Sequence, residues 1–273
     1  MRAKKNLGQN FLRDESVISR IVGELAPRGD ETIIEIGSGH GALTSRLVER
    51  AGRLVAIELD RGLVPVLREK FANRDSFELI EQDALTTDFC SLIAPAQHAR
   101  VIANLPYNIS TAILQKLIEQ RRCLTEMLLM LQREVVERIT APPSTSARGF
   151  LSVVVEAYCE TEALFDVAPE AFRPVPKVWS TIVRLRMRPT PAADVQDESL
   201  LWRLVSVGFM QRRKTLFNNL RHAPEDMRAR VEAGGGAARV LERAGINPER
   251  RAETLTLAEW ASITRSIAAG GSR

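Results

Sequence analysis

The chain has 273 residues, of which 45% are hydrophobic and 26% are charged, enough to bury a core in one large domain and a small one. It contains no run of about 18 apolar residues, so we expect no transmembrane helix. Its basic start leads into Gly8-Gln9-Asn10 instead of an apolar stretch, which argues against a secretory signal.

The cysteines are few and widely spaced. Cys90, Cys123 and Cys159 include no Cys-x-x-Cys pair, and only three histidines are present. This pattern argues against a disulfide framework and against a zinc site, and it is typical of proteins kept in a reducing cytoplasm. We therefore expect a cytoplasmic protein with neither a disulfide framework nor a bound metal.

The formal net charge of +4 is unevenly distributed along the chain. Residues 200–273 contain 13 Lys and Arg against 7 Asp and Glu, whereas the first 199 residues contain 25 against 27. A positive segment of this kind favours a polyanionic partner. On charge alone, a solvated helical surface is an equally good interpretation.

Strand and helix patterns alternate along the first part of the chain. A helical pattern begins at Asp14 and ends at Pro27, and further helices are expected at residues 43–48, 63–71 and 111–120. Strand-like apolar runs cover residues 32–36, 53–57, 77–80, 101–103 and 127–131. This alternation predicts βαβ units with a mostly parallel sheet, so the fold class is α/β.

The organisation changes near residue 190. Residues 163–167 and 181–187 alternate β-branched residues and are expected to pair antiparallel at the sheet edge. The segment 189–194 is the best linker candidate, and every periodic segment beyond it is helical. We therefore predict one domain of residues 1–190 and a small all-helical domain of residues 191–273.

A glycine-rich turn follows the first strand of the sheet, with the sequence Glu35-Ile36-Gly37-Ser38-Gly39-His40-Gly41. Glycines there let the backbone turn sharply and approach a ligand at the carboxyl end of a parallel strand. Glu58 ends the second strand, where a carboxylate can accept both ribose hydroxyls of an adenosine. Asp83 follows the third strand and is placed to accept the adenine amine.

The same glycines also satisfy a dinucleotide-binding fingerprint, which makes an NAD enzyme the main rival. A glycine-rich turn that holds no ligand is a third interpretation. Glu35 favours the methionine end of S-adenosylmethionine, because the loop that binds it has no pyrophosphate to cradle. The motif that ends the fourth strand favours the same cofactor.

That motif is Asn104-Leu105-Pro106-Tyr107. The exocyclic amine of adenine is a poor nucleophile because its lone pair is delocalised into the ring, so a methyltransferase must accept both amine hydrogens. The Asn104 side-chain oxygen and the Leu105 carbonyl are the expected acceptors, and Pro106 stiffens the turn between them. Tyr107 offers a stacking face. An ordinary strand-end turn is the alternative interpretation, because Asn and Pro are common in turns.

Taken together, these residues resemble the small-subunit ribosomal RNA adenine dimethyltransferases, the family known for kasugamycin sensitivity, nearly from end to end. Three further segments carry the resemblance: residues 6–12, residues 172–180 and the basic stretch 212–220, which looks like the family's basic helix. Ser38 and His40 depart from the residues usual in the glycine turn, and Phe217 stands where Arg is usual. None of these changes removes a catalytic atom.

The resemblance implies a seven-stranded Rossmann-like methyltransferase domain, a small helical RNA-binding domain and dimethylation of two adjacent adenines near the 3′ end of small-subunit RNA. It implies S-adenosylmethionine as cofactor and, as partner, the RNA of an assembling ribosomal subunit; no membrane partner and a monomer are expected. Asn104, Leu105, Pro106 and Tyr107, with Phe172, would hold a flipped adenine between the Tyr107 and Phe172 rings. The expected cofactor residues are Asn10, Leu12, Glu35, Gly37, Gly39, Gly41, Glu58, Asp83 and Asn104.

Expected RNA contacts lie outside this pocket, at Lys4, Lys5, Arg173, Lys177, Arg212, Arg213 and Lys214. Three consecutive cations cannot all lie on one helix face, so at least one of the last three is expected to be structural or solvated. The tryptophans, Trp179 among them, are expected in the core. A large-subunit methyltransferase of the macrolide-resistance type, and a binding factor for ribosome assembly with secondary catalysis, stay open as alternatives.

Overall fold

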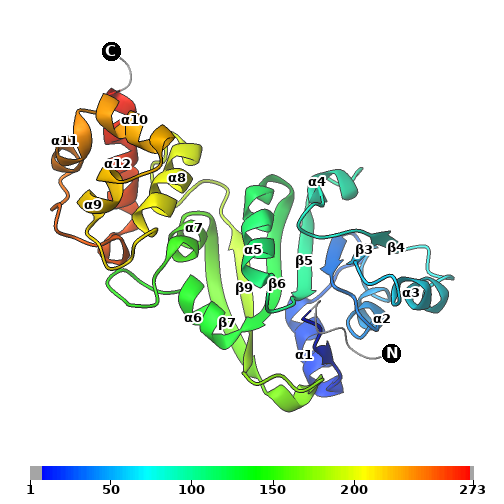
Figure 1. Ribbon diagram of the computed structural model, residues 1–273. Coiled ribbons are helices and arrows are strands. Elements are labelled where there is room, and N and C mark those ends of the chain that lie inside the picture. The colour runs from blue at the N-terminus through cyan, green and yellow to red at the C-terminus, as the bar shows by residue number, and fades with distance from the viewer. Residues whose placement is uncertain (1–7, 271–273) are drawn as a thin grey trace. The chain divides into compact units, whose positions relative to one another are not determined.

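The structure is a computed structural model that describes residues 8–270 (Figure 1). Its main feature is a seven-stranded sheet with the order β4-β3-β2-β5-β6-β9-β7. The predicted α/β class is confirmed, and every expected strand is present. The strands are β2 (Thr32–Ile36), β3 (Arg53–Glu58), β4 (Phe77–Glu81), β5 (Ala99–Asn104), β6 (Leu124–Gln132), β7 (Cys159–Val167) and β9 (Ser180–Met187).

The strand directions bring several chain segments to one edge of the sheet. The ladders β2–β3, β3–β4, β2–β5 and β5–β6 are parallel, whereas β9 runs antiparallel to β6. The strands β9 and β7, which the sequence paired at the sheet edge, are neighbours there. The carboxyl ends of the parallel strands therefore lie together, which is where α/β folds bind ligands. Ser180 pairs with Gln132 in the β6–β9 ladder, so β9 begins at this same edge.

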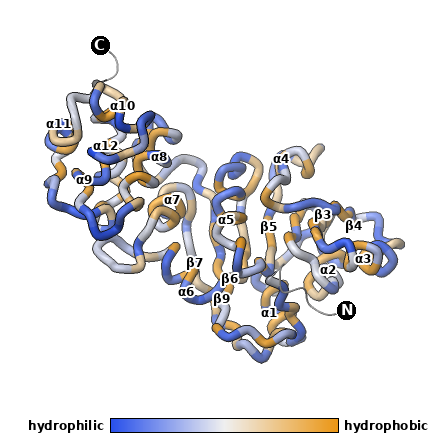
Figure 2. Tube along the Cα trace, in the orientation of Figure 1, coloured by the Kyte–Doolittle hydropathy of each residue, from blue (hydrophilic) through white to orange (hydrophobic). Residues whose placement is uncertain are grey.

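Apolar strands and an amphipathic helix build the core beneath that edge. All five residues of β2 are buried, as expected for a parallel strand covered on both faces. Figure 2 shows hydrophobic residues along β5, its neighbour in the sheet. Helix α1 (Glu15–Leu25) begins where the Asp14 carboxylate accepts hydrogen bonds from the Ser16 and Val17 amides. It buries the residues at helical spacing, Ile18, Ile21, Val22 and Leu25.

A second, two-stranded ladder lies outside the main sheet. It joins β1 (Phe11–Leu12) antiparallel to β8 (Phe172–Arg173), with Leu12 opposite Phe172. This ladder ties the start of the described chain to the segment that precedes β9. The helices of this part are α2 (Thr44–Leu47), α3 (Val64–Lys70), α4 (Phe89–Leu92), α5 (Ser110–Glu119) and α6 (Arg133–Ile139).

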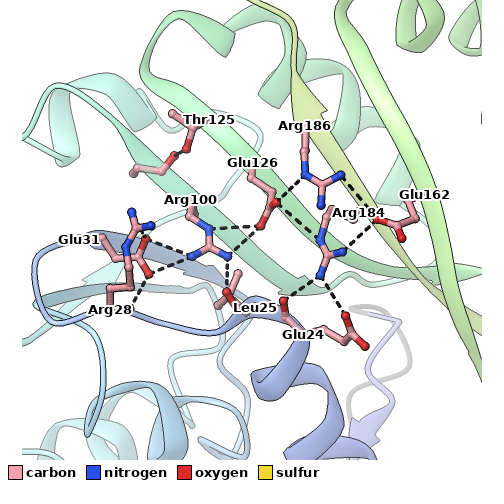
Figure 3. Close-up of polar contacts among 11 residues, drawn as sticks. Glu24, Leu25, Arg28, Glu31, Arg100, Thr125, Glu126, Glu162, Arg184 and Arg186 are labelled. Atoms are coloured by element: carbon pink, nitrogen blue, oxygen red, sulfur yellow. Dashed lines mark hydrogen bonds and ion pairs between the residues drawn. The ribbon is translucent and has the colours of Figure 1, made fainter.

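An ion network closes the amino ends of the central strands, at the edge opposite the one described above (Figure 3). Arg100 of β5 bonds Glu126 of β6 at 2.8 Å and Glu31 at 3.0 Å. Arg184 of β9 donates to the Glu24 carboxylate at the end of α1 at 3.0 Å. These side chains are 34% exposed or less, so the pairs are only lightly screened by solvent. The network joins α1, β5, β6 and β9 far from the ligand-binding edge.

The chain divides into two compact units. The first comprises the described residues up to Val136 together with Glu160–Met187, and the second comprises Glu137–Cys159 with the described residues from Arg188 onwards. The second unit is helical, as expected for the end of the chain. Its helices are α7 (Phe150–Tyr158), α8 (Glu198–Gly208), α9 (Leu216–Arg221), α10 (Glu225–Ala233), α11 (Gly236–Arg243) and α12 (Leu257–Gly270).

The observed division into units differs from the sequence-based one mainly at residues 137–159, and by three residues at the boundary before Arg188. Residues 137–159 group with the C-terminal helices, although the sequence placed them in the first domain. The reason is packing: the Trp202 indole of α8 donates a 3.0 Å hydrogen bond to the Tyr158 hydroxyl of α7. The Phe150 ring lies 5.9 Å from the Trp202 ring, between centroids. Helix α7 therefore belongs to the core of the helical unit.

The cysteine spacing argued against a disulfide framework, but the structure contains one disulfide. Cys90 of α4 and Cys123, which precedes β6, form a disulfide across 33 positions of sequence. The two segments are also joined by Gln120, whose side chain accepts from the Phe89 amide at 2.7 Å and donates to the Thr87 carbonyl at 2.9 Å. Sequence spacing could not show this proximity, because it arises only when α4 and the end of α5 pack together.

Within residues 8–270, the helices lack the combination of length and apolar composition that crossing a membrane requires. The same part of the chain gathers no three His, Cys, Asp or Glu side chains into a cluster suited to a metal ion.

Candidate methyl-transfer site

A cavity opens at the carboxyl ends of the central strands. Gly37 lines it after β2, Glu58 at the end of β3, Asp83 after β4 and Asn104 at the end of β5. The segment before β1 closes one side. The cavity therefore brings together most residues that the sequence assigned to cofactor and substrate: Asn10, Gly37, Gly39, Glu58, Asp83, Asn104, Leu105, Pro106 and Tyr107.

The glycine turn has the backbone conformation that requires glycine at two cavity positions. Gly37 has φ +75° and Gly39 has φ +57°, both in the left-handed region. A Cβ atom on Gly39 would lie 3.1 Å from the Phe11 ring, so the turn is packed against the segment of β1. The Gly37 amide is held by the Ile57 carbonyl at 2.8 Å. The turn is thus fixed against β3 before any ligand arrives.

Gly41 has a different role from the one expected. It lies at φ +77°, and a Cβ atom there would approach the Phe71 ring to 3.0 Å. It does not line the cavity, whereas Gly37 and Gly39 do. Gly41 therefore allows the end of the turn to pack on the residue that follows α3, and it does not face a ligand.

The Glu58 carboxylate is buried and already holds two backbone amides. One oxygen accepts from the Gly39 amide at 2.8 Å and the other from the Asp60 amide at 2.8 Å. Each carboxylate oxygen has a second lone pair, so the group can still accept hydrogen bonds from a ligand. The fixed amides aim the carboxylate and attach it to the glycine turn. Sequence reasoning found the residue but not these contacts.

Glu35 lies behind the turn and supports it. One of its oxygens accepts from the Thr44 hydroxyl at 2.6 Å and from the Ser38 hydroxyl at 3.1 Å. Burial raises the pKa of this carboxyl to about 7, while the hydrogen bonds from Thr44 and Ser38 oppose that rise. Glu35 lines a small hollow next to the cavity, together with Leu12 and Asn104. Its direct effect is to hold the shape of the turn.

Asp83 is positioned by a turn of its own. One carboxylate oxygen accepts from the Leu85 amide at 2.9 Å, and the Asp83 carbonyl accepts from the Thr87 hydroxyl at 2.8 Å. These bonds fix the side chain at the rim of the cavity beyond β4. The other carboxylate oxygen is the acceptor suited to an amine such as that of adenine.

Asn104 is oriented by a contact with the start of the described chain. Its side-chain Nδ2 donates to the Asn10 carbonyl at 3.0 Å. Because the amide nitrogen is engaged there, the side-chain oxygen is the atom left as an acceptor, on a residue that lines the cavity. The contact also explains why Asn10 lines the site. Asn10 therefore holds the side chain of Asn104 in place.

Tyr107 is held by a residue to which the sequence assigned no role. Its hydroxyl and the Ser180 hydroxyl lie 2.8 Å apart. Burial raises the pKa of Tyr107 above its ordinary value, although the hydrogen bond with Ser180 opposes the shift, so the phenol stays protonated at neutral pH. Ser180 is buried at the start of β9, beside the end of β6. It holds the hydroxyl end of the Tyr107 ring from a strand far along the chain.

Phe172 and Leu12 are not presented to the main cavity. Phe172 has no exposed surface and packs in the apolar core with Leu12, its partner in the β1–β8 ladder. The expected sandwich of a base between Tyr107 and Phe172 is therefore not formed by this arrangement. The physical reason is the ladder itself, which turns both side chains inward beneath the glycine turn.

The expected RNA contacts of the first unit divide into two groups. Lys4 and Lys5 lie outside the described residues. Arg173 and Lys177 are exposed in the segment that leads to β9. Arg173 donates to the backbone carbonyls of Phe172 and Glu170, at 2.9 and 3.3 Å.

The basic stretch of the second unit is not helical where its cations lie. Arg212, Arg213 and Lys214 form a turn, and α9 begins after Thr215, whose hydroxyl caps the helix by accepting from the Asn218 amide. Arg212 donates to the carbonyls of Ser146 and Arg148, the latter at 3.0 Å. It therefore ties down a neighbouring loop, whereas Arg213 and Lys214 are exposed.

Fold and site together define a class. A seven-stranded sheet with a glycine turn after β2, acids after β3 and β4, and an Asn-Leu-Pro-Tyr motif after β5 is the arrangement of Rossmann-like methyltransferases. The comparisons narrow this class. Residues 1–268 match the family described as "Ribosomal RNA adenine dimethylase". The chain belongs to this family of RNA-modifying enzymes.

Relatives and solved structures agree with that assignment. The chain is 44% identical to a ribosomal RNA small subunit methyltransferase A of Hahella chejuensis, over 96% of this chain and 91% of that protein. It is 46% identical to the protein of the same name from Chromohalobacter salexigens, over 97% and 92%. Among solved structures, the 23S rRNA methyltransferase ErmE has a TM-score of 0.66 at 27% identity, covering 95% of this chain and 100% of that one. A Plasmodium falciparum dimethyladenosine transferase has the same fold, with a TM-score of 0.78 at 23% identity and coverage of 96% and 98%.

Proposed function

We propose that this enzyme uses S-adenosylmethionine to dimethylate the exocyclic amines of two adjacent adenines near the 3′ end of small-subunit ribosomal RNA. The observation that carries the proposal is the oriented Asn104 amide, whose Nδ2 bonds the Asn10 carbonyl in the same cavity as Glu58 and Asp83. A purely structural strand-end turn has no need of an amide acceptor fixed toward a cavity.

The cavity suits an adenosine-containing cofactor. Glu58 is the acceptor for ribose hydroxyls, and Asp83 is the acceptor for the adenine amine of the cofactor. Gly37 and Gly39 bring the backbone of the turn to the cavity wall beside Asn10, where the methionine end would lie. Glu35 acts through Thr44 and Ser38 by keeping the turn in shape. The bound cofactor would supply a methyl group on a positively charged sulfur, already activated for transfer.

The enzyme's own contribution is to prepare the target nitrogen. Asn104 Oδ1 and the Leu105 carbonyl accept the two amine hydrogens, which draws the nitrogen out of conjugation and exposes its lone pair. Transfer would form one N–C bond as the cofactor's S–C bond breaks, and the proton that the amine then gives up would pass to solvent water from the oxygens of Asn104 and Leu105 that hold it. Holding the reacting atoms in line accounts for much of the rate, because no strong base is required.

Tyr107 provides the face on which the flipped base stacks. The contact between its hydroxyl and Ser180 holds one end of the ring and leaves the ring face unused. Stacking of this kind recovers part of the energy that extruding a base costs. Phe172 is buried, whereas Tyr107 of the Asn-Leu-Pro-Tyr motif lines the cavity. The sandwich partner implied by family resemblance would require a rearrangement of β8.

We assign RNA binding to exposed cations in both units. Arg173 and Lys177 lie in the segment of the first unit that leads to β9, and Arg213 and Lys214 lie in the turn before α9. Contacts of this type neutralise phosphates and make binding depend on salt. Arg212 is assigned instead to the fold of its own unit. The helical unit would thus act as the main RNA-binding body, on a monomeric enzyme that works where small subunits are assembled, in the cytoplasm.

The small subunit is favoured over the large one by the relatives. The proteins that are 44% and 46% identical are small-subunit enzymes by name, whereas the large-subunit methyltransferase is 27% identical. An experiment can separate the two. Purified enzyme and radiolabelled S-adenosylmethionine are incubated with under-methylated small subunits or with large subunits, and the modified nucleosides are identified by mass.

We expect dimethyladenosine in the small-subunit RNA alone, mapped by primer extension to two adjacent adenines. Asn104→Ala serves as the control for contaminating activity. Label found only in large subunits would reject the substrate assignment but keep the chemistry. If both substrates stay unlabelled, adenine methylation itself is rejected.

A further inference from the structure

An exposed tryptophan precedes Ser180, the residue whose hydroxyl lies against that of Tyr107. The sequence placed Trp179 in the core, but 48% of its surface is exposed. It ends a segment whose other large apolar residues, Val175 and Val178, are exposed as well. An indole left in solvent carries a cost that burial would remove, so a cluster of this kind marks an interaction surface.

The Trp179 backbone is bonded to the residue that follows β6, at the edge of the sheet where the parallel strands end. Its carbonyl accepts from the Arg133 amide at 3.0 Å, where α6 begins. The next residue, Ser180, holds the Tyr107 hydroxyl at 2.8 Å. Consecutive Cα atoms are only about 3.8 Å apart, so the indole is attached next to the support of the base platform.

The charge around the indole points to the kind of partner. Arg173 and Lys177 are exposed on the same segment, and across residues 8–270 no acid forms an ion pair with either of them. Arg173 donates hydrogen bonds to two backbone carbonyls. Proteins bind single-stranded nucleic acid with this combination of groups. The bases stack on the aromatic ring, and the phosphates pair with the neighbouring cations.

We propose that Trp179 is a stacking platform for a nucleotide that flanks the target adenine, with Arg173 and Lys177 binding the adjoining phosphates. This inference rests on the proposed function and deepens it. Side chains alternate along an extended chain, so the residue before Ser180 faces away from Tyr107. The indole therefore serves a neighbouring nucleotide, and the target base keeps Tyr107. Trp179 would select substrates whose target adenines lie in a single-stranded segment.

Tryptophan fluorescence tests the contact directly. A short single-stranded RNA with two adjacent adenines is titrated into the wild-type enzyme and into Trp179→Phe. Of the other tryptophans, Trp260 is fully buried and Trp202 packs against Tyr158. We expect the RNA to quench the wild-type emission and to leave that of Trp179→Phe nearly unchanged. Equal quenching in both proteins would overturn the proposal.

Affinity measurements add a second readout. Trp179→Ala should bind the RNA about 5- to 150-fold more weakly, which is the range for one stacked base, with an unchanged salt slope. Trp179→Phe should restore most of the affinity. Arg173→Ala and Lys177→Ala should each reduce the salt slope by about 1. Val66→Ala, another exposed apolar residue, is the matched control and should bind as wild type does.

The outcomes separate the inference from the function. Wild-type affinity in Trp179→Ala, with dimethylation of small subunits intact, rejects the platform alone. Quenching by whole subunits but not by RNA would mean a protein partner and would also reject it. If wild-type enzyme methylates no adenine, the proposed function fails whatever the fluorescence shows.

Discussion

The side-chain amide of Asn104 donates a 3.0 Å hydrogen bond to the backbone carbonyl of Asn10, a residue 94 positions earlier in the chain. This contact occupies the nitrogen of the amide. With the nitrogen engaged, the oxygen is presented as an acceptor. The segment before β1 therefore takes part in the chemistry without touching the reacting atoms, because it sets the orientation of the residue that does.

Asn104→Ala should reduce methyl transfer far more than cofactor binding. Removing one preorganised polar group from a reacting centre lowers turnover by about 100-fold or more, whereas the other cofactor residues stay in place. Turnover is measured with small subunits, and the dissociation constant of S-adenosylmethionine by calorimetry. Asn104→Asp keeps an acceptor but loses the donor to Asn10, so its turnover should also fall. Equal losses in turnover and cofactor affinity would contradict the assigned role.

Glu58→Ala should weaken binding of S-adenosylmethionine and raise its apparent KM. Hydrogen bonds to a charged acceptor contribute about 1.5–3 kcal/mol, which corresponds to about 10- to 150-fold in affinity. Glu81 is the matched control, because it pairs with Glu58 across the β3–β4 ladder but does not line the cavity. Glu81→Ala should keep wild-type affinity. An unaltered KM in Glu58→Ala would remove ribose recognition from this residue.

The parts of the fold that could be predicted are those with a strong local pattern. The apolar run of β2 and the turn at Gly37 and Gly39 are encoded within a few residues. Asp14 marks the start of α1 in the sequence and caps it in the structure. The positions of Glu58 and Asp83 also followed, because the carboxyl ends of parallel strands meet at one edge.

The missed features depend on tertiary packing. Residues 150–158 contain three consecutive valines, which suit a strand, but α7 is helical because its apolar faces are buried in the second unit. Phe172 carries the family motif yet is turned into the core by its pairing with Leu12. The Tyr107–Ser180 contact joins residues 73 positions apart, and no local pattern announces it.

Opening the Cys90–Cys123 disulfide should destabilise the protein. A bond that closes a loop across 33 positions is expected to stabilise the fold by about 3–4 kcal/mol, mainly by restricting the unfolded chain. Urea unfolding with and without dithiothreitol should show this loss for the wild type. The double variant Cys90→Ala and Cys123→Ala should unfold identically in both conditions.

A thiol count provides the independent check on the disulfide. Denatured, unreduced protein should react through one thiol, that of Cys159, since the other two cysteines are bonded. Three reactive thiols, together with no effect of dithiothreitol on the wild type, would show that the bond does not form. The disulfide is also linked to the cavity. Gln120 donates to the Thr87 carbonyl, and the Thr87 hydroxyl donates to the carbonyl of Asp83.

The buried Glu35 carboxyl makes stability fall as pH rises. Burial raises its pKa from 4.5 to about 7, so between these values the folded protein holds a proton that the unfolded chain releases. The free energy of unfolding therefore decreases from about pH 4.5 to about pH 7 and stays lower above it. The contribution of this group amounts to about 3 kcal/mol, at 1.36 kcal/mol per unit of pKa.

Glu35→Gln isolates this effect because glutamine does not titrate. The difference in unfolding free energy between Glu35→Gln and the wild type should shift in favour of the variant by about 3 kcal/mol between pH 4.5 and pH 8. Urea midpoints at these two pH values measure it. Glu69→Gln, at an exposed position of α3, should show a constant difference. If that difference for Glu35→Gln does not change with pH, Glu35 is already ionised at pH 4.5. The glycine turn would then be supported by a buried charge that Thr44 and Ser38 hold.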